Sequence, residues 1–298
     1  MSGTRHGRLY NEGFIAGPGL TKPVFFRSWS PPVRRASVLY LHGVGGNSSD
    51  ASRLAERLME IGCGTIAVDM PGNGFSPADE RPRNERMLGQ MRFVRSLLPD
   101  PRRERAALVC DSGGALLGFP ILHSLRREPW AAQVPVVLAE PVFGHDASTH
   151  GFIESCMQFY GRSYPSLDAA VAAWQACELR QVAFDNDADR REFVAGMLRP
   201  EGAALVPRGA VARHRELLRS KDFELLAGKE PIANPALVLW AEGGRLVGKY
   251  DAEVRRVFPA AQVHVARGAG HPLPIVREAE LQTVQAFLAD SLGLGRNG

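Results

Sequence analysis

The sequence predicts an α/β protein with a doubly wound, mostly parallel sheet and an inserted helical segment. Short apolar runs with strand character alternate along the chain with segments whose apolar residues recur at helical spacing. This alternation is typical of parallel sheets covered by helices on both faces. A second observation is a strand-like run at residues 107–111 that turns sharply over small residues into an apolar, helix-like segment. A third is a long region, residues 143–233, in which the predicted elements are helical.

The first half of the chain contains most of the predicted sheet. The helix at 50–61 is indicated by Leu54, Leu58 and Ile61, which share one face. Strands are predicted at residues 23–29, 36–41, 64–69, 107–111 and 134–141, and helices at 50–61, 83–98 and from 115 onward. The strands read as nearly continuous apolar runs, which indicates burial on both faces.

The second half completes the sheet after the helical region. Strands are predicted at residues 235–240 and 261–265, followed by a helix at 276–292 and a frayed end. Within the helical region, Ser166 is a plausible N-cap for a helix that includes Trp174. Further helices are expected at about 190–198 and 211–226, separated by the breakers Pro200, Gly202 and Pro207.

Ser112 occupies the sharp turn that follows the strand at 107–111. A nucleophile on such an elbow has a strained backbone, and the positions two before and two after it must be small because strand and helix approach closely. Cys110 and Gly114 meet this requirement. The pattern therefore favours Ser112 as a nucleophile, with a purely structural turn as the alternative.

Asp111 offers a second register for the same elbow. Its flanking positions would be Val109 and Gly113. The branched Cβ of valine fits the first of these positions less well than cysteine fits its own. The serine register is favoured, and an aspartate nucleophile remains open.

A glycine-rich turn, residues 42–47, follows the strand at 36–41. Glycines let the backbone turn its N–H groups toward a ligand. The amide of Val44 is the expected second donor of an oxyanion hole, and the amide of Gly113, at the start of the helix after the elbow, is the first. An ordinary glycine-rich turn is the alternative interpretation.

Composition and charge limit the classes of partner. The chain has 298 residues, is 45% hydrophobic and carries a formal net charge of +4. Its arginines alternate with acids along the whole length, which indicates a solvated surface and not a nucleic-acid stripe. No apolar run long enough for a membrane span and no signal-peptide core is present. We therefore expect a cytoplasmic protein with a small-molecule substrate, no nucleic-acid or membrane partner, and self-association as a homodimer left open.

Neither a metal nor a cofactor is expected. His145, Asp146 and His150 are close in sequence, but no metal-hydrolase spacing accompanies them. The four cysteines have no metal or redox spacing and are interpreted as reduced thiols: Cys63, Cys110, Cys156 and Cys177.

Four motifs, in this order, resemble the α/β-hydrolase superfamily. They are His42-Gly43, the turn at 69–76, the elbow at 110–114 and the segment 268–272, which contains His271. The resemblance implies an α/β-hydrolase core at residues 1–142 and 234–298, with a helical cap at 143–233. It also implies that His271 is the general base, and it leaves the substrate open because the fold hosts many chemistries.

The predicted cap supplies candidates for substrate contact. Tyr160, Tyr164 and Trp174 are aromatic residues of this region that we expect to line a pocket, with burial in the cap's own core as the alternative.

The acid of the predicted catalytic triad departs from the usual position. In most relatives an aspartate follows the seventh strand, and alignment of that pattern puts it at Gly244, which has no side chain to orient an imidazole. A minority, including haloalkane dehalogenases and zearalenone-type lactone hydrolases, carry the acid after the sixth strand, which here ends in Glu140. Glu140 is therefore the predicted acid, and Glu242, Asp146 and Asp251 are the substitutes.

These residues together predict acyl transfer. Ser112 attacks a carboxylic ester, with a lactone or a thioester as the other expected substrates, His271 moves the proton and Glu140 orients His271. The alternatives are an Asp111-dependent epoxide hydrolase or dehalogenase, a Ser-His C–C bond hydrolase, a cofactor-free dioxygenase and a non-catalytic ligand-binding member of the fold. Against the Asp111 enzymes, Gly45 replaces the proline usual in epoxide hydrolases and Ser112 replaces the halide-binding tryptophan of dehalogenases.

Overall fold

The architecture was obtained as a computed structural model. It describes residues 2–5, 8–100, 102–142, 151, 154, 158–177, 184–209, 230–244, 247, 250–270 and 277–295. Within these ranges one nine-stranded sheet has the order β1-β2-β3-β5-β4-β6-β7-β10-β11. Its strands are β1 Ser2–Arg5, β2 Arg8–Ile15, β3 Val24–Trp29, β4 Ala36–Leu41, β5 Cys63–Val68, β6 Arg105–Asp111, β7 Val136–Ala139, β10 Ala236–Ala241 and β11 Gln262–Ala266. The pairs from β5 to β11 are parallel, whereas β1, β2 and β3 join by antiparallel pairing.

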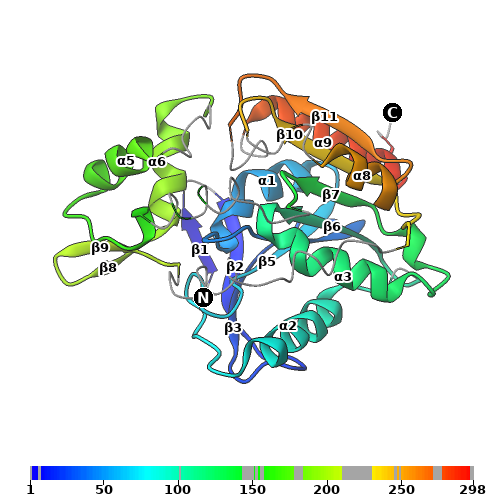
Figure 1. Cartoon of the computed structure of the whole chain (residues 1–298), viewed down its shortest axis with the longest axis horizontal. Coiled ribbons are helices and arrows are strands. Elements are labelled where there is room, and N and C mark those ends of the chain that lie inside the picture. Colours follow the sequence, from blue (N-terminus) through cyan, green and yellow to red (C-terminus); the bar gives the residue numbers. More distant parts are fainter. Residues whose placement is uncertain are drawn as a thin grey trace.

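Helices cover both faces of this sheet (Figure 1). Alternate residues of a strand face opposite sides, so Val109 packs with α1 (Ser52–Glu60) and α9 (Glu278–Ser291), whereas Leu108 packs on the opposite face. That face is covered by α2 (Arg83–Leu97), α3 (Ala115–Leu125) and α8 (Asp251–Val257). The predicted doubly wound, mostly parallel sheet of the α/β-hydrolase fold is confirmed.

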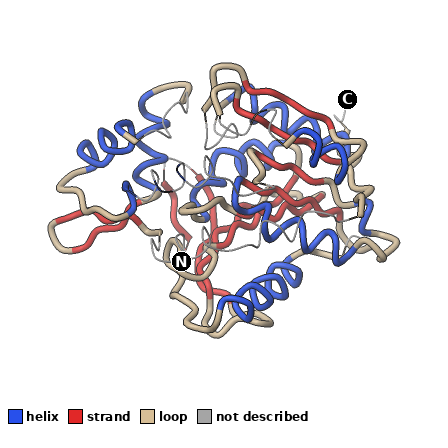
Figure 2. Tube along the Cα trace, viewed as in Figure 1, coloured by secondary structure: helices blue, strands red, loops and turns tan. Residues whose placement is uncertain are grey.

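The predicted strands all occur, with ends shifted by a few residues, and three features were not predicted. One is a hairpin at residues 198–207, in the region expected to be helical: the helix expected at about 190–198 is Asp187–Gly196, and Leu198 already belongs to a strand. The β1–β2 hairpin adds an antiparallel edge to the sheet, and its sequence alternates polar and apolar residues too irregularly to read as a buried strand. The short helix α8 follows Tyr250. Figure 2 shows how the strands run through the centre of the core between the helices.

A separate group of elements lies at one end of the molecule in Figure 1. It comprises α5 (Leu167–Ala176), α6 (Asp187–Gly196) and the hairpin of β8 (Leu198–Glu201) and β9 (Ala204–Pro207). Ser166 caps α5 as expected, since its Oγ accepts the Ala169 N–H at 3.2 Å. The expected breakers Pro200 and Pro207 lie in the hairpin.

This group has its own apolar cluster, built around Phe159, Trp174 and Val194. The division into a core and a cap at 143–233 stays a prediction, because residues 143–150 and the predicted helix at 211–226 lie outside the described ranges.

Candidate active site

Ser112 lies at the turn between β6 and α3. Asp111 ends the strand in an extended conformation, with φ −96° and ψ 127°. Ser112 then adopts a φ of +43°, and the 3₁₀ turn Ser112–Gly114 leads into α3. Because L-residues rarely adopt positive φ, the strained position of this elbow is Ser112 and not Asp111.

The small flanks of Ser112 are required by close packing. A Cβ built on Gly114 would lie 2.3 Å from the carbonyl oxygen of Leu41, a backbone atom that cannot move aside. On the other side of the elbow, Cys110 packs so tightly against α3 that a Cβ on Gly118 would lie 2.3 Å from its Sγ. The larger side chains that would separate strand from helix are thus excluded at both positions.

The two predicted oxyanion donors come from segments that touch. A Cβ on Gly113 would lie 3.2 Å from the backbone nitrogen of Val44 and 2.6 Å from Val44 Cγ2. The fold therefore brings the glycine-rich turn against the start of the helix after Ser112. Both residues line one cavity, together with His42 and Gly114.

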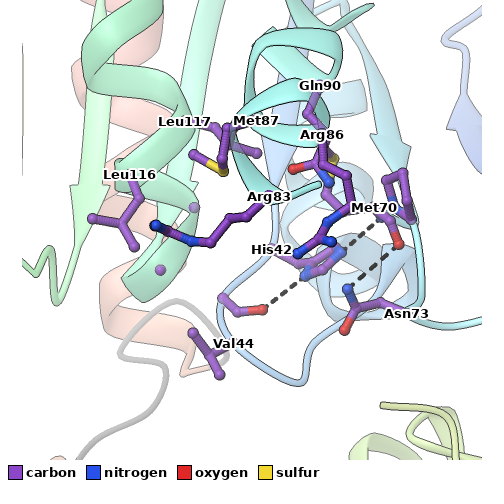
Figure 3. A pocket seen from close by; sticks show the side chains of 14 residues that line it. His42, Val44, Met70, Asn73, Arg83, Arg86, Met87, Gln90, Leu116 and Leu117 are labelled. Carbon is purple, nitrogen blue, oxygen red and sulfur yellow. Dashed lines mark hydrogen bonds between the residues drawn. The ribbon is translucent and has the colours of Figure 1, made fainter. Parts of the chain in front are cut away.

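His42 fixes the start of the glycine-rich turn, a role that sequence reasoning did not assign. Its Nε2 accepts the N–H of Met70 at 3.0 Å, so its Nδ1 carries the proton and donates to the carbonyl of Gly43 at 2.8 Å (Figure 3). Burial lowers the pKa of His42, which keeps the ring neutral. The residue therefore clamps the loops after β4 and β5 together.

The carboxylate of Asp69 binds backbone N–H groups of two segments next to the glycine-rich turn. Its Oδ1 accepts the Ser48 N–H at 2.6 Å and its Oδ2 accepts the Phe75 N–H at 2.8 Å. Gly74 has a φ of +55°, and a Cβ there would overlap the Asp69 carboxylate. The turn at 69–76 is thus tied through Asp69 to Ser48, directly after the glycine-rich turn at 42–47.

The carboxyl of Asp111 is buried and is not suited to act as an anion. Its side chain is 3% exposed. Burial raises the pKa of Asp111 well above its ordinary value, and the nearby Asp50 and Glu140 carboxylates raise it further. The hydrogen bond from the Gly43 backbone opposes this rise, but the larger contributions disfavour the anionic form that an aspartate nucleophile requires.

Glu140 follows β7 beside the elbow. The register of β6 and β7 pairs Asp111 with Ala139, so Ser112 and Glu140 are the next residues of two adjacent strands. Among the described residues, these two are the non-glycine residues with positive φ, at +43° and +48°. Such strain concentrates at functional sites.

The Glu140 carboxylate is fully buried and reaches the end of β10. Its Oε1 accepts the Ala241 N–H at 2.5 Å. Its Oε2 would lie 2.8 Å from a Cβ on Gly244. The carboxylate of Glu140 therefore occupies the region where the sequence alignment expected a seventh-strand acid.

His271 lies outside the described residues, as does the alternative acid Asp146. Ala269, two residues before His271, accepts the Gly243 N–H at 2.8 Å and packs against Ala241, whose N–H binds Glu140. Glu242 is exposed, and its Oε2 accepts the Gly268 N–H at 2.9 Å. Asp251 begins α8. Of the described candidate acids, Glu140 is the one next to the elbow.

A cavity of about 130 Å³ opens at the elbow (Figure 3). Its lining contains both predicted oxyanion residues and one face of α2. The lining residues are His42, Gly43, Val44, Met70, Pro71, Asn73, Arg83, Arg86, Met87, Gln90, Gly113, Gly114, Leu116 and Leu117. Sequence reasoning did not single out the α2 residues, although positions 83, 86, 87 and 90 have the spacing of a single helical face.

Tyr160, Tyr164 and Trp174 belong to the apolar cluster around Phe159 and are not among the described residues that line this cavity. Tyr164 donates its hydroxyl to the Phe159 carbonyl at 2.8 Å. Trp174 packs edge-on to Phe159. Tyr160 lies against the glycine-rich turn, where a Cβ on Gly45 would be 2.5 Å from its ring. Their contact with a substrate stays a prediction.

A mostly parallel sheet with a strained serine between its central strand and a helix defines an α/β hydrolase. The chain belongs to the alpha/beta hydrolase family, whose model matches residues 38–285. It is 24% identical over 259 residues to the mouse sn-1-specific diacylglycerol lipase ABHD11, covering 85% of this chain and 81% of that protein.

Solved structures share the fold. An alpha/beta hydrolase from Novosphingobium aromaticivorans has a TM-score of 0.70 at 17% identity, covering 96% of this chain and 99% of the other. E-2-(acetamidomethylene)succinate hydrolase has a TM-score of 0.69 at 20% identity, covering 94% and 99%. Across the described residues, no helix combines the length and apolar character that a membrane span requires.

Proposed function

We propose that the protein is a serine hydrolase of carboxylic esters or lactones that works through an acyl-enzyme. Ser112 Oγ attacks the carbonyl carbon and its proton passes to His271. The alcohol leaves with that proton: from a linear ester it is released as the first product, and from a lactone it stays attached to the acyl group as the hydroxyl of the opened ring. Water, deprotonated by His271, then attacks the acyl carbon and releases the acid and Ser112.

The observation that carries the proposal is the pairing of Ser112 with Glu140 at the ends of adjacent strands, both strained and both buried. A carboxylate in this position suits the task of holding His271 in one tautomer and stabilising its imidazolium. The Val44 and Gly113 amides suit the task of stabilising the oxyanion, because their segments are in contact beside Ser112.

The comparisons support the reaction class. The mouse relative is a diacylglycerol lipase, which cleaves esters. Other structures of similar fold are described as an esterase and a thioesterase domain. The Asp111 alternatives are less well supported, since that carboxyl is buried, has a raised pKa and does not occupy the strained position.

A fluorophosphonate reagent combined with an aryl ester tests the proposal. The wild-type protein should hydrolyse 4-nitrophenyl butyrate and gain one phosphonyl group on the peptide that contains Ser112. Ser112→Ala should lose both, by about a millionfold in turnover. An active Ser112→Ala with an inactive Asp111→Asn would instead assign the Asp111 chemistry. Absence of turnover and labelling in a folded protein would favour the non-catalytic alternative.

A further inference from the structure

One face of α2 forms a wall of the cavity at the elbow. Arg83, Arg86, Met87 and Gln90 line it, at positions i, i+3, i+4 and i+7 of the helix. Figure 3 shows the Arg83 side chain extending from α2 across the cavity toward the side where Leu116 lies. The helix thus presents two guanidinium groups and an amide to the space beside the oxyanion donors.

The charge of this wall is positive. The described residues that line the cavity include Arg83 and Arg86 and no aspartate or glutamate. Asp79, a buried acid that precedes α2, is bound by Arg81, whose Nη2 donates to Asp79 Oδ2 at 2.6 Å, and it also attracts Arg86. Glu85 is exposed on the helix and does not line the cavity.

Arg86 is held in place by the chain that precedes it. Its Nη1 donates to the carbonyl of Arg81 at 2.6 Å. Arg83 is the first residue of α2, directly after Pro82. The N-terminal turn of a helix favours an anion through its partial positive charge and unpaired N–H groups, which adds to the charge of the two arginines.

The remaining walls are largely apolar. Met70, Leu116 and Leu117 contribute side chains to these walls, and Met87 adds an apolar side chain from α2. In such surroundings a guanidinium interacts more strongly with an anion than it does in water. The planar guanidinium also matches a carboxylate with two parallel hydrogen bonds.

We propose that the substrate carries a carboxylate that Arg83 binds, with Arg86 beside it, while its ester or lactone carbonyl occupies the oxyanion hole. The inference rests on the proposed hydrolase function and narrows its substrates to esters or lactones that carry a carboxylate. The carboxylate belongs either to the acyl part or to the alcohol part of the ester. Arg83 is thereby assigned as a specificity-determining residue.

Two pairs of esters test the inference. The acyl pair is mono-4-nitrophenyl glutarate and 4-nitrophenyl butyrate, and the alcohol pair is 4-acetoxybenzoate and 4-methylphenyl acetate. The readout is the ratio of kcat/KM for the carboxylate-bearing ester to kcat/KM for the neutral ester of the same pair. A change in the catalytic machinery that affects both esters equally cancels in this ratio. Arg83→Gln should lower this ratio in at least one pair by roughly 10- to 100-fold, the range expected for a hydrogen bond to a charged group.

Two further variants sharpen the result. Arg83→Lys keeps the charge without the planar fork and should retain part of the preference. Arg92→Gln removes an exposed arginine of the same helix that is not among the residues lining the cavity, and it should leave both ratios unchanged. In the wild type, added salt should reduce the preference.

The inference is overturned if Arg83→Gln leaves the ratio unchanged in both pairs. It is also overturned if Arg92→Gln lowers the ratio as much as Arg83→Gln does, because the effect would then be one of overall charge. Failure of the proposed function gives a different result: no ester of either pair is hydrolysed, and Ser112 is not labelled by the fluorophosphonate.

Discussion

Glu140 and Gly244 have complementary shapes, since Oε2 of Glu140 lies 2.8 Å from the position that a Cβ on Gly244 would occupy. A carboxylate carried after β7 and a side chain carried after β10 cannot fill that space together. The absence of a side chain at residue 244 is therefore consistent with an acid supplied by Glu140. It provides a structural reason for the departure from the usual triad pattern.

Glu140→Gln tests this role directly. The amide oxygen of glutamine can still accept the Ala241 N–H, so the fold should be retained with little change in Tm. The amide cannot stabilise the imidazolium of His271, and kcat for 4-nitrophenyl butyrate should fall by roughly 10⁴, as when the aspartate of other triads becomes asparagine. Glu242→Gln, at an exposed position nearby, is the matched control. Loss of kcat in the control with a near-normal Glu140→Gln would contradict the assignment.

Gly244→Ala tests the complementarity from the other partner. The new Cβ would meet Glu140 Oε2 at 2.8 Å and the Ala241 carbonyl at 2.9 Å, so the carboxylate must shift. A displacement of about 1 Å in a catalytic group typically reduces the rate by about 10²-fold. We expect a fall of this order in kcat. Gly295→Ala, which would meet no atom within 4 Å, should leave kcat unchanged. A fully active Gly244→Ala would show that Glu140 need not be held in this position.

Strain at Ser112 predicts an unusual order of stabilities. A non-glycine residue with positive φ is destabilising by about 1 kcal/mol or more, and glycine relieves this. Ser112→Gly should therefore have a higher free energy of unfolding than Ser112→Ala by about 1 kcal/mol in urea titrations, although both are inactive. The control is Ser96, near the end of α2. There glycine should be less stable than alanine by about 0.5 to 1 kcal/mol. If Ser112→Gly, like Ser96→Gly, is less stable than the matching alanine variant, the backbone at Ser112 is not strained.

The sequence predicted the parallel part of the sheet well because each buried strand is a continuous apolar run. It also predicted the sharp turn at Ser112, because the small residues Cys110 and Gly114 that such a turn requires lie within two positions of it in the sequence. The β1–β2 hairpin was missed because an edge hairpin gains its order from pairing with β3, which lies outside its own sequence. Local patterns do not contain this information.

The other features that could not be predicted from the sequence depend on contacts between residues far apart in the chain. Nothing local to residue 140 or residue 244 indicates that their atoms meet. The spacing of Arg83 and Arg86 was present in the sequence, but only the packing of α2 turns that face toward the elbow. Tyr164 and Trp174 are apolar enough to line a pocket or to join a core, and only tertiary packing places them in the cluster with Phe159 and Val194.

Asp50 is a buried carboxyl that contacts the glycine-rich turn at Asn47. We expect it to make the free energy of unfolding depend on pH. Its Oδ2 accepts the Asn47 N–H at 3.0 Å, and no described residue hydrogen-bonds its Oδ1. Burial raises the pKa of Asp50 to about 7, with a contribution from the Asp69 carboxylate. In the unfolded chain the pKa of an aspartate is about 3.9.

The folded state therefore binds the Asp50 proton more tightly than the unfolded state does. The stabilisation from this proton is complete below about pH 4 and is lost as the pH rises to about 7. Asparagine carries no titrating proton, so the free energy of unfolding of Asp50→Asn relative to wild type should increase from pH 5 to pH 8, by about 1 to 4 kcal/mol. Urea titrations at both pH values measure this difference. Asp100→Asn is the control, because Arg102 lowers the pKa of that partly exposed carboxyl and its titration is complete below this range. If the difference in free energy of unfolding between Asp50→Asn and wild type is the same at pH 5 and pH 8, Asp50 is ionised in the folded protein throughout this range.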